Sequence, residues 1–241
     1  LLEALLSLKK DDTNEILVLG IMDDPKIVGP TEEDKDVIKK LVEVLDFNEL
    51  KKSIHTTKFR EKDGIELIGE QAIIEYLFKP GLSINGIESG YYGSGTLTII
   101  PSEAHANLDI RLPPFQEVDY VKNCYQKHLS EKFPMIEAHF GSGYGPAKMS
   151  PSHPLIQAVK TTYEEFGKKP MFYPLLAGSA PFSMFQSILK LPFVFGGLGH
   201  GGRVHTPLEY AVIESNNPNV GGIREFEKFF AFLLEEFAQK F

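Results

Sequence analysis

The sequence predicts an α+β domain, an antiparallel sheet with helices on one face, followed by the C-terminal part of an α/β domain. The first prediction rests on residues 104–112, where apolar and polar residues alternate without interruption. The second rests on residues 141–154, which are rich in Gly, Ser and Pro and predict a linker. Beyond this linker, helical and strand patterns alternate, which favours α/β architecture.

The first domain begins with an amphipathic pattern over residues 1–6, and the apolar run at 15–19 then predicts a short strand. Thr31 and Asp34 resemble a capping box, and apolar residues follow at helical spacing as far as Leu45. The remaining predictions are helices over 69–78 and 118–132 and strands over 82–88, 96–101, 104–112 and 135–140.

The region after the linker predicts fewer strands than a stable sheet needs. Its predicted elements are helices over 155–166, 181–189 and 223–237 and strands over 171–176 and 191–195. Because two strands are too few to stand alone, we expect partner strands from an N-terminal half or from another chain. The chain also begins with Leu1 rather than Met, so we expect it to be a fragment that lacks the N-terminal part of this domain.

The composition excludes several classes of protein. The 241 residues are 42% hydrophobic, carry a net charge of −8 and have a pI of about 5.4. Nucleic acid is therefore an improbable partner, because its phosphates require clustered Lys and Arg. No apolar run reaches the roughly 20 residues of a membrane helix. The single cysteine, Cys124, fits a reducing compartment, so we expect a cytoplasmic protein without a membrane partner.

Five glycines and two histidines lie in the stretch GGLGHGGRVHTPLEY, residues 196–210. Its spacing satisfies G-x-G-x-x-G after an apolar strand pattern. A dinucleotide site would require a helix directly after the glycines, and residues 203–207 intervene instead. A nucleotide-binding oxidoreductase is accordingly disfavoured.

Residues 206–209 instead predict a helix that begins after His205. Thr206 is a suitable N-cap, Pro207 suits the first helical position, and Glu209 completes a capping box. His205 would then lie on a loop beyond the end of a strand, where open α/β sheets bind ligands. It is either a metal ligand or a surface histidine beside a turn, and His200 is either a second ligand or a mobile loop residue.

The order strand, Gly-rich loop, His-Thr-Pro-x-Glu and terminal helix resembles the C-terminal end of the co-catalytic zinc metallopeptidases of family M20. This family includes dipeptidases, aminoacylase and succinyl-diaminopimelate desuccinylase. Further stretches resemble the family in the same order: residues 30–33, 82–88, 95–101, 108–112 and 177–181.

The resemblance implies a lid and dimerisation domain over residues 1–146, incomplete at its start, and the C-terminal segment of the catalytic domain over 147–241. It implies a metal-dependent amide hydrolase, either a dipeptidase or carboxypeptidase or an N-acyl-amino-acid deacylase, that forms a homodimer through the lid. Two divalent ions, Zn with Mn or Co as alternatives, would activate water in the complete enzyme. The general base and the other ligands would precede Leu1, so we expect this chain to contain no catalytic residue, to bind metal weakly and to be inactive alone.

The resemblance also assigns individual residues. His205 would be the metal ligand, and Arg111 would bind the terminal carboxylate of a peptide or acyl-amino-acid substrate, unless it is a solvated arginine paired with Asp109. Thr98 would contact substrate, and Gly178 and Ser179 would offer a carboxylate-docking turn, unless Ser179 is only a helix cap. Four histidines have no ligand-like partner at useful spacing: His55, His128, His139 and His153. His105, on the same strand face as Arg111, is expected to be a surface residue. A non-catalytic dimerisation or ligand-binding protein derived from the family is the alternative function.

Overall fold

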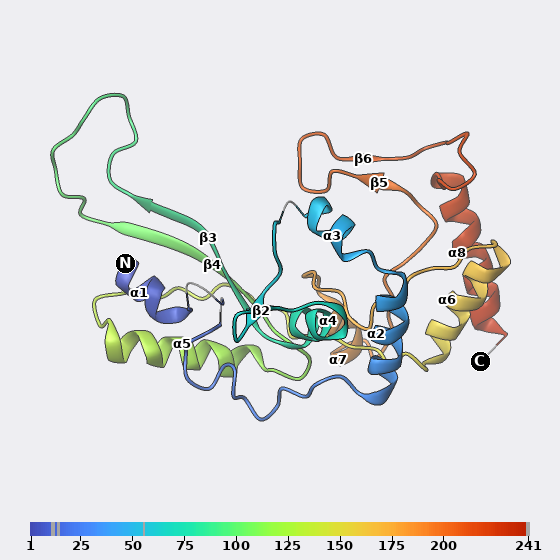
Figure 1. Ribbon diagram of the computed structural model, residues 1–241, viewed down its shortest axis with the longest axis horizontal. Coiled ribbons are helices and arrows are strands. Elements are labelled where there is room, and N and C mark those ends of the chain that lie inside the picture. The colour runs from blue at the N-terminus through green and yellow to red at the C-terminus, as the bar shows by residue number, and fades with distance from the viewer. Residues whose placement is uncertain (11–12, 14, 55, 240–241) are drawn as a thin grey trace.

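The structure is a computed structural model that describes residues 1–10, 13, 15–54 and 56–239 (Figure 1). Its helices are α1 (Leu2–Leu8), α2 (Glu32–Val44), α3 (Phe47–Ser53), α4 (Gly69–Phe78), α5 (Val118–Lys132), α6 (Pro154–Glu165), α7 (Phe182–Ser187) and α8 (Ile223–Ala238). Its strands are β1 (Glu61–Lys62), β2 (Ile65–Glu66), β3 (Gly81–Ser89), β4 (Ala104–Arg111), β5 (Gly201–Gly202) and β6 (Tyr210–Ala211), and they form antiparallel pairs. His55 lies outside the described residues.

The first core joins the β3–β4 pair to α1 and α5, which lie along one face of the pair (Figure 1). Leu82 pairs with Ile110 across the two strands, and the register shifts between Ile84 and Gly86. The apolar face predicted for residues 104–112 is the face that packs, because Ala106, Ile110 and Leu112 contact this core. An antiparallel arrangement with helices on one face is therefore confirmed.

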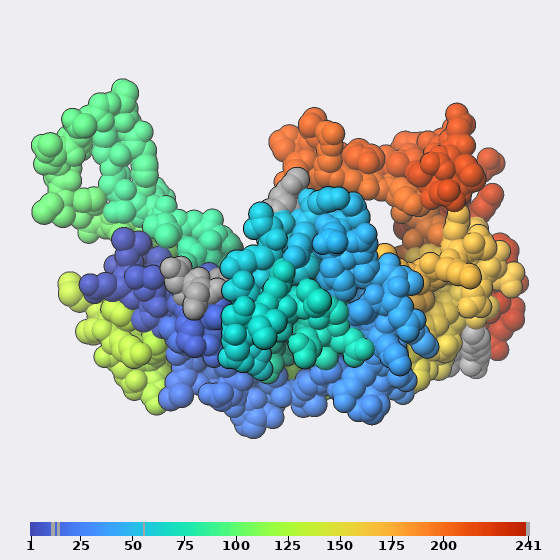
Figure 2. Space-filling model, viewed as in Figure 1, coloured from blue at the N-terminus to red at the C-terminus, as the bar shows by residue number. Residues whose placement is uncertain are grey.

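The connection between β3 and β4 projects from the rest of the molecule as an open loop (Figure 2). The strand predicted over 96–101 is wrong, since these residues belong to this loop and form no strand. Leu97, Ile99 and Ile100 have exposed fractions of 58%, 68% and 91%. In the described part of the chain, these apolar side chains pack on no core and their backbone pairs with no strand. A regular β-strand is therefore not stabilised there.

The second core lies between α2 and α4, and α3 and the β1–β2 pair flank it (Figure 1). Ile38 and Leu41 of α2 pack against Ile73 and Leu77 of α4. The predicted capping box at the start of α2 is confirmed, because the Thr31 hydroxyl accepts from the Asp34 N–H and the Asp34 carboxylate accepts from the Thr31 N–H.

The third core lies between α6 and α8 at the C-terminal end of the molecule. Phe229 and Leu233 of α8 pack against Ala158 and Val159 of α6. Tyr163 and Phe166 place their rings 4.6 and 6.1 Å from the Phe229 ring. The helices predicted over 155–166, 181–189 and 223–237 are present as α6, α7 and α8, although α7 is shorter than expected.

The parallel sheet predicted for residues 147–241 is not present among the described residues. Residues 171–176 and 191–195 are assigned to no strand, and neither are 135–140. Residues 15–19 contribute only an isolated bridge between Lys9 and Ile16. These segments carry strand-like sequences, but a strand is completed by hydrogen bonds to a neighbour, and no neighbour pairs with them in the part described.

None of the helices in the described residues is both long enough and apolar enough to cross a membrane.

Candidate functional site

Arg111 is the last residue of β4, and its guanidinium is held from two sides. Asp109 lies two residues earlier on the same face of the strand, as the alternation of a strand requires. The Arg111 Nε lies 2.7 Å from Asp109 Oδ2, and both side chains are partly exposed. This ion pair is the one expected if Arg111 is a solvated arginine paired with Asp109, which is the alternative to a substrate-binding role.

The second contact joins Arg111 to Ser179, which is 68 residues further along the chain. Arg111 Nη1 donates to Ser179 Oγ at 2.7 Å. The sequence placed both residues in one substrate site, and the structure brings them together. Two of the five guanidinium donors are engaged in these contacts, and a planar guanidinium can use its others to hold a carboxylate.

Ser179 is not a helix cap. Pro181 occupies the N-cap position of α7, and no side-chain hydrogen bond caps this helix. Gly178 precedes Ser179 on an exposed turn, where an added Cβ would meet the Leu176 side chain at 3.3 Å. Because α7 has only six residues, the expected anion site at a helix start has little support.

His205 lies on an exposed turn, and the helix predicted after it is wrong. Its φ of 65° is in the left-handed region. The predicted capping groups do interact locally: Glu209 Oε2 accepts from the His205 N–H at 3.1 Å, and Thr206 Oγ1 accepts from the Leu208 N–H at 3.3 Å. A helix cannot continue, because β6 begins at Tyr210 and pairs back onto β5.

The glycines of the same stretch allow close approach of the two hairpin strands. A Cβ on Gly201 would lie 2.5 Å from the Tyr210 carbonyl oxygen, and one on Gly202 would lie 3.0 Å from the Tyr210 hydroxyl. His200 is also committed to the backbone, since its Nδ1 accepts from the Gly221 N–H at 2.7 Å. The glycine spacing therefore serves a hairpin, which agrees with the rejection of a dinucleotide loop.

The described residues do not fit a two-metal centre. Among them, no group of three or more His, Cys, Asp or Glu side chains could hold a metal ion. His205 offers one imidazole, and its backbone N–H is bonded to Glu209. A structural zinc site needs four protein ligands and a catalytic one needs three, so His205 alone falls short of either.

Thr98 is separate from this corner of the molecule. It lies in the exposed loop between β3 and β4, which Figure 1 shows at the end of the molecule opposite α6 and α8. The β5–β6 hairpin that carries His205 is likewise separated from that loop (Figure 1). Arg111 and Ser179 thus form a pair, and the structure joins neither Thr98 nor His205 to it.

A cleft of about 880 Å³ lies near the end of β4 but is lined by neither Arg111 nor Ser179. Its walls come from the start of α2, from the loop that follows β4 and from the linker before α6. The lining residues are Thr31, Glu32, Glu33, Pro114, Phe115, Gln116, Glu117, Val118, Gly145, Pro146, Ala147, Lys148, Ser150 and Gln186. Phe115 has a φ of 72°, a conformation that is uncommon for a bulky residue.

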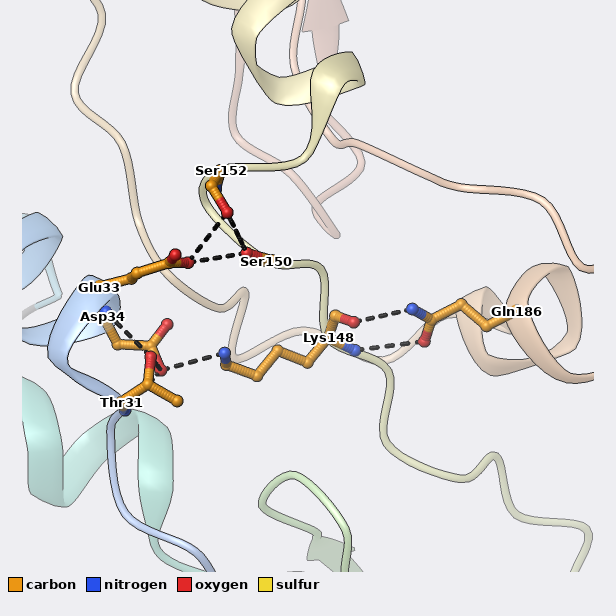
Figure 3. Close-up of polar contacts among 7 residues, drawn as sticks. All are labelled: Thr31, Glu33, Asp34, Lys148, Ser150, Ser152 and Gln186. Carbon is orange, nitrogen blue, oxygen red and sulfur yellow. Dashed lines mark hydrogen bonds and ion pairs between the residues drawn. The ribbon is translucent and has the colours of Figure 1, made fainter.

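Sequence reasoning missed the polar contacts that join this linker to both sides (Figure 3). Lys148 Nζ lies 3.0 Å from Asp34 Oδ2, and the Gln186 side chain bonds both backbone groups of Lys148. The sequence predicts only a capping-box role for Asp34. The one available signal was a lysine within an otherwise uncharged stretch, residues 141–152, and that does not identify its partner.

Residues 1–137 match the family model of the M20 peptidase dimerisation domain. The human Beta-Ala-His dipeptidase is 34% identical over 133 residues, which are 55% of this chain and 24% of that protein.

Solved structures are similar over more of the chain. The crystal structure of human carnosine dipeptidase 1 has a TM-score of 0.72 at 25% identity and covers 99% of this chain and 49% of its own. The M20 family metallo-carboxypeptidase Sso-CP2 from Sulfolobus solfataricus has a TM-score of 0.65 at 28% identity and covers 79% and 47%. The chain thus spans about half the length of these relatives. Since the family model matches more than half of the chain, the protein belongs to the M20 peptidase family, with its dimerisation domain in residues 1–137.

Proposed function

We propose that this chain is the lid and C-terminal part of a metal-dependent amide hydrolase, and that it supplies the corner that binds a substrate carboxylate. The reaction class would be dipeptide or C-terminal peptide hydrolysis, or deacylation of an N-acyl-amino acid. Residues 1–146 would form the lid and 147–241 the end of the catalytic domain. Membership of the M20 family supports the hydrolase class.

One observation carries the proposal: the hydrogen bond of 2.7 Å between Arg111 Nη1 and Ser179 Oγ. It joins a lid strand to the segment after the linker, where two domains of one enzyme would meet. Asp109 orients the guanidinium from its Nε edge. A substrate carboxylate would accept from the remaining guanidinium donors and displace or share the Ser179 hydroxyl.

The catalytic part of the site would be completed by polypeptide outside the described residues. Residues 171–176 and 191–195 carry exposed apolar side chains, among them Leu176 at 55% and Phe195 at 73%. Phe172 and Val194, in the same segments, pack on the third core. Apolar side chains on both faces are typical of strands inside a parallel sheet, which further strands would cover.

Divalent metal ions would be cofactors of the whole protein, as the names of its M20 relatives imply. His205 would be this chain's single contribution, and the other ligands and the general base would come from outside it. Zn, Mn and Co remain the proposed ions. We assign no step of the reaction to metal in these 241 residues.

We further propose a homodimer formed through residues 1–137, which the match to a dimerisation domain supports. The exposed apolar residues of the loop between β3 and β4 offer a surface for the second copy. A cytoplasmic location is supported by the single cysteine, Cys124.

The proposal is tested with the gene itself. The coding sequence upstream of Leu1 should encode a His-x-Asp motif and a Glu-Glu pair, and the longer polypeptide should hydrolyse peptides in the presence of added Zn²⁺ or Mn²⁺. In that enzyme, Arg111→Met should lower kcat/KM about 10- to 100-fold, because a charge-assisted hydrogen bond to the substrate is lost. Lys127→Met, an exposed position on α5, is the matched control and should leave kcat/KM unchanged.

A non-catalytic dimerisation or ligand-binding module is the second candidate. It is favoured by the finding that the described residues contain no group of ligands for a metal. An upstream sequence without the two motifs, together with a stable dimer in sedimentation velocity, would support this candidate and overturn the hydrolase proposal.

A further inference from the structure

Lys148 connects two parts of the molecule that are far apart in the sequence (Figure 3). Its side chain reaches α2, where Nζ lies 3.0 Å from Asp34 Oδ2. Its backbone reaches α7, where Gln186 Oε1 accepts from the Lys148 N–H at 3.3 Å and Gln186 Nε2 donates to the Lys148 carbonyl at 2.7 Å. A single linker residue therefore holds two helices.

The α2 end of this connection is buried. Asp34 is fully buried, and its Oδ2 also accepts from the N–H and the hydroxyl of Thr31, both at 2.8 Å. Its Oδ1 is buried with no hydrogen-bond partner among the described residues. An ionised carboxylate in such a place needs a counter-charge, and Lys148, whose side chain is 14% exposed, supplies it.

The linker is attached again a short distance beyond Lys148. Glu33 Oε2 accepts from the Ser150 hydroxyl at 2.7 Å and from the Ser152 hydroxyl at 3.3 Å. These two hydrogen bonds lower the pKa of Glu33 below its usual value. Their groups are exposed and contribute little stability, but they fix the direction in which the linker leaves α2.

The α7 end of the connection leads to Ser179. Gln186 lies on α7, which begins three residues after Ser179, and Ser179 accepts from Arg111. The segment 179–186 is thus tied to the first part of the chain at both ends, directly by Arg111 at one and through Lys148 to Asp34 at the other. The cleft of about 880 Å³ is lined by Lys148 and Gln186 on this side and by Phe115, four residues after Arg111, on the other.

We propose that Lys148 is a positioning residue, which holds the segment 179–186 against residues 1–146 and so keeps Ser179 within reach of Arg111. The importance of Lys148 for substrate binding rests on the proposed function. The contacts that Lys148 makes do not depend on that function, so a failure of the positioning role and a failure of the hydrolase proposal are distinguishable.

A distance measurement between α5 and α7 tests this role in the full 241-residue chain. Spin labels are attached at Lys127→Cys and Ser187→Cys, both exposed positions, in a Cys124→Ser background, and the distance distribution is recorded by double electron–electron resonance. We expect a narrow distribution for the otherwise native chain. Lys148→Met should abolish the native distance peak, whereas Lys148→Arg, which keeps the charge, should retain it.

Lys35→Met is the matched control, because Lys35 forms an exposed ion pair with Glu32 on the same helix and, among the described residues, reaches no second element. It should leave the distribution unchanged. If circular dichroism shows that Lys148→Met is unfolded, Gln186→Ala breaks the α7 arm while the buried ion pair stays intact, and it should also abolish the native peak. A native peak in folded Lys148→Met, or in Gln186→Ala, would overturn the proposal.

Discussion

At the scale of single residues, one buried histidine makes the first core sensitive to protons. His128 of α5 is 7% exposed, and its Nε2 lies 2.9 Å from Ser7 Oγ on α1. Burial lowers the pKa of His128, the charge of Lys132 lowers it further, and Glu131 opposes the change. When the pH falls through the unfolded value of about 6.5, the unfolded chain binds the proton more readily, and stability is lost.

We therefore expect the free energy of unfolding to fall between about pH 7.5 and pH 5.5, by at most about 1.4 kcal/mol per pH unit from this one group. Urea denaturation at each pH, followed by tyrosine fluorescence, measures it. His128→Gln should remove this part of the slope. His139→Gln, at an exposed histidine 3.2 Å from Glu137, should leave the slope as it is, and equal slopes for all three chains would contradict the assignment.

The residues of the candidate site differ in how far sequence could predict them. Arg111 and Ser179 were predicted from family motifs, and the folded chain brings the end of β4 next to the segment before α7. Lys148 could not be predicted, because its partners Asp34 and Gln186 are 114 and 38 positions away and only the folded chain brings them together. The role of His205 stays a prediction, since the described residues offer it no companion ligands.

At the scale of elements, the sequence predicted most of the helices, although it missed α3 and placed a helix after His205 that does not form, and several of its predicted strands are absent. A helix satisfies its hydrogen bonds within its own segment, so its local sequence pattern was enough to predict α4 and α5 with their observed bounds. A strand depends on a neighbour. Residues 104–112 have β3 beside them and form β4, whereas 96–101 have a similar pattern and no neighbour in the described part.

The third core gives a prediction at this scale. Phe229 of α8 is 1% exposed and is surrounded by the rings of Tyr163 and Phe166, so Phe229→Ala should leave a cavity and cost about 3–5 kcal/mol of unfolding free energy. Leu234→Ala on the same helix removes a side chain that is 68% exposed and should change it by less than about 0.5 kcal/mol. Urea denaturation compares the two, and equal losses would contradict the packing of α8 on α6.

At the scale of the whole molecule, the chain has three separate cores along an elongated shape instead of one (Figure 1). The polar contacts of Arg111 and Lys148 join its first and last parts, while residues 171–176 and 191–195 leave apolar surface exposed. Our proposal that the chain folds against further polypeptide would account for this surface, and the chain spans about half the length of human carnosine dipeptidase 1.

From this arrangement we expect the 241-residue chain alone to hydrolyse no dipeptide when Zn²⁺ or Mn²⁺ is added, because His205 has no companion ligands among the described residues. An amine-release assay over a panel of dipeptides and N-acyl-amino acids measures this, with the metal-free chain as background. Metal-dependent hydrolysis above that background would contradict the expectation.

The central claim, that Arg111 and Ser179 form a corner that binds a carboxylate, is tested most directly by NMR titration of the ¹⁵N-labelled chain. Glycylglycine is compared with its C-terminal amide, which lacks only the negative charge. We predict that glycylglycine shifts the Arg111 Nε–H and Ser179 amide signals, that the amide does not, and that Arg111→Met abolishes the Ser179 shift. Equal shifts from both ligands, or none at Ser179 from either, would contradict the claim.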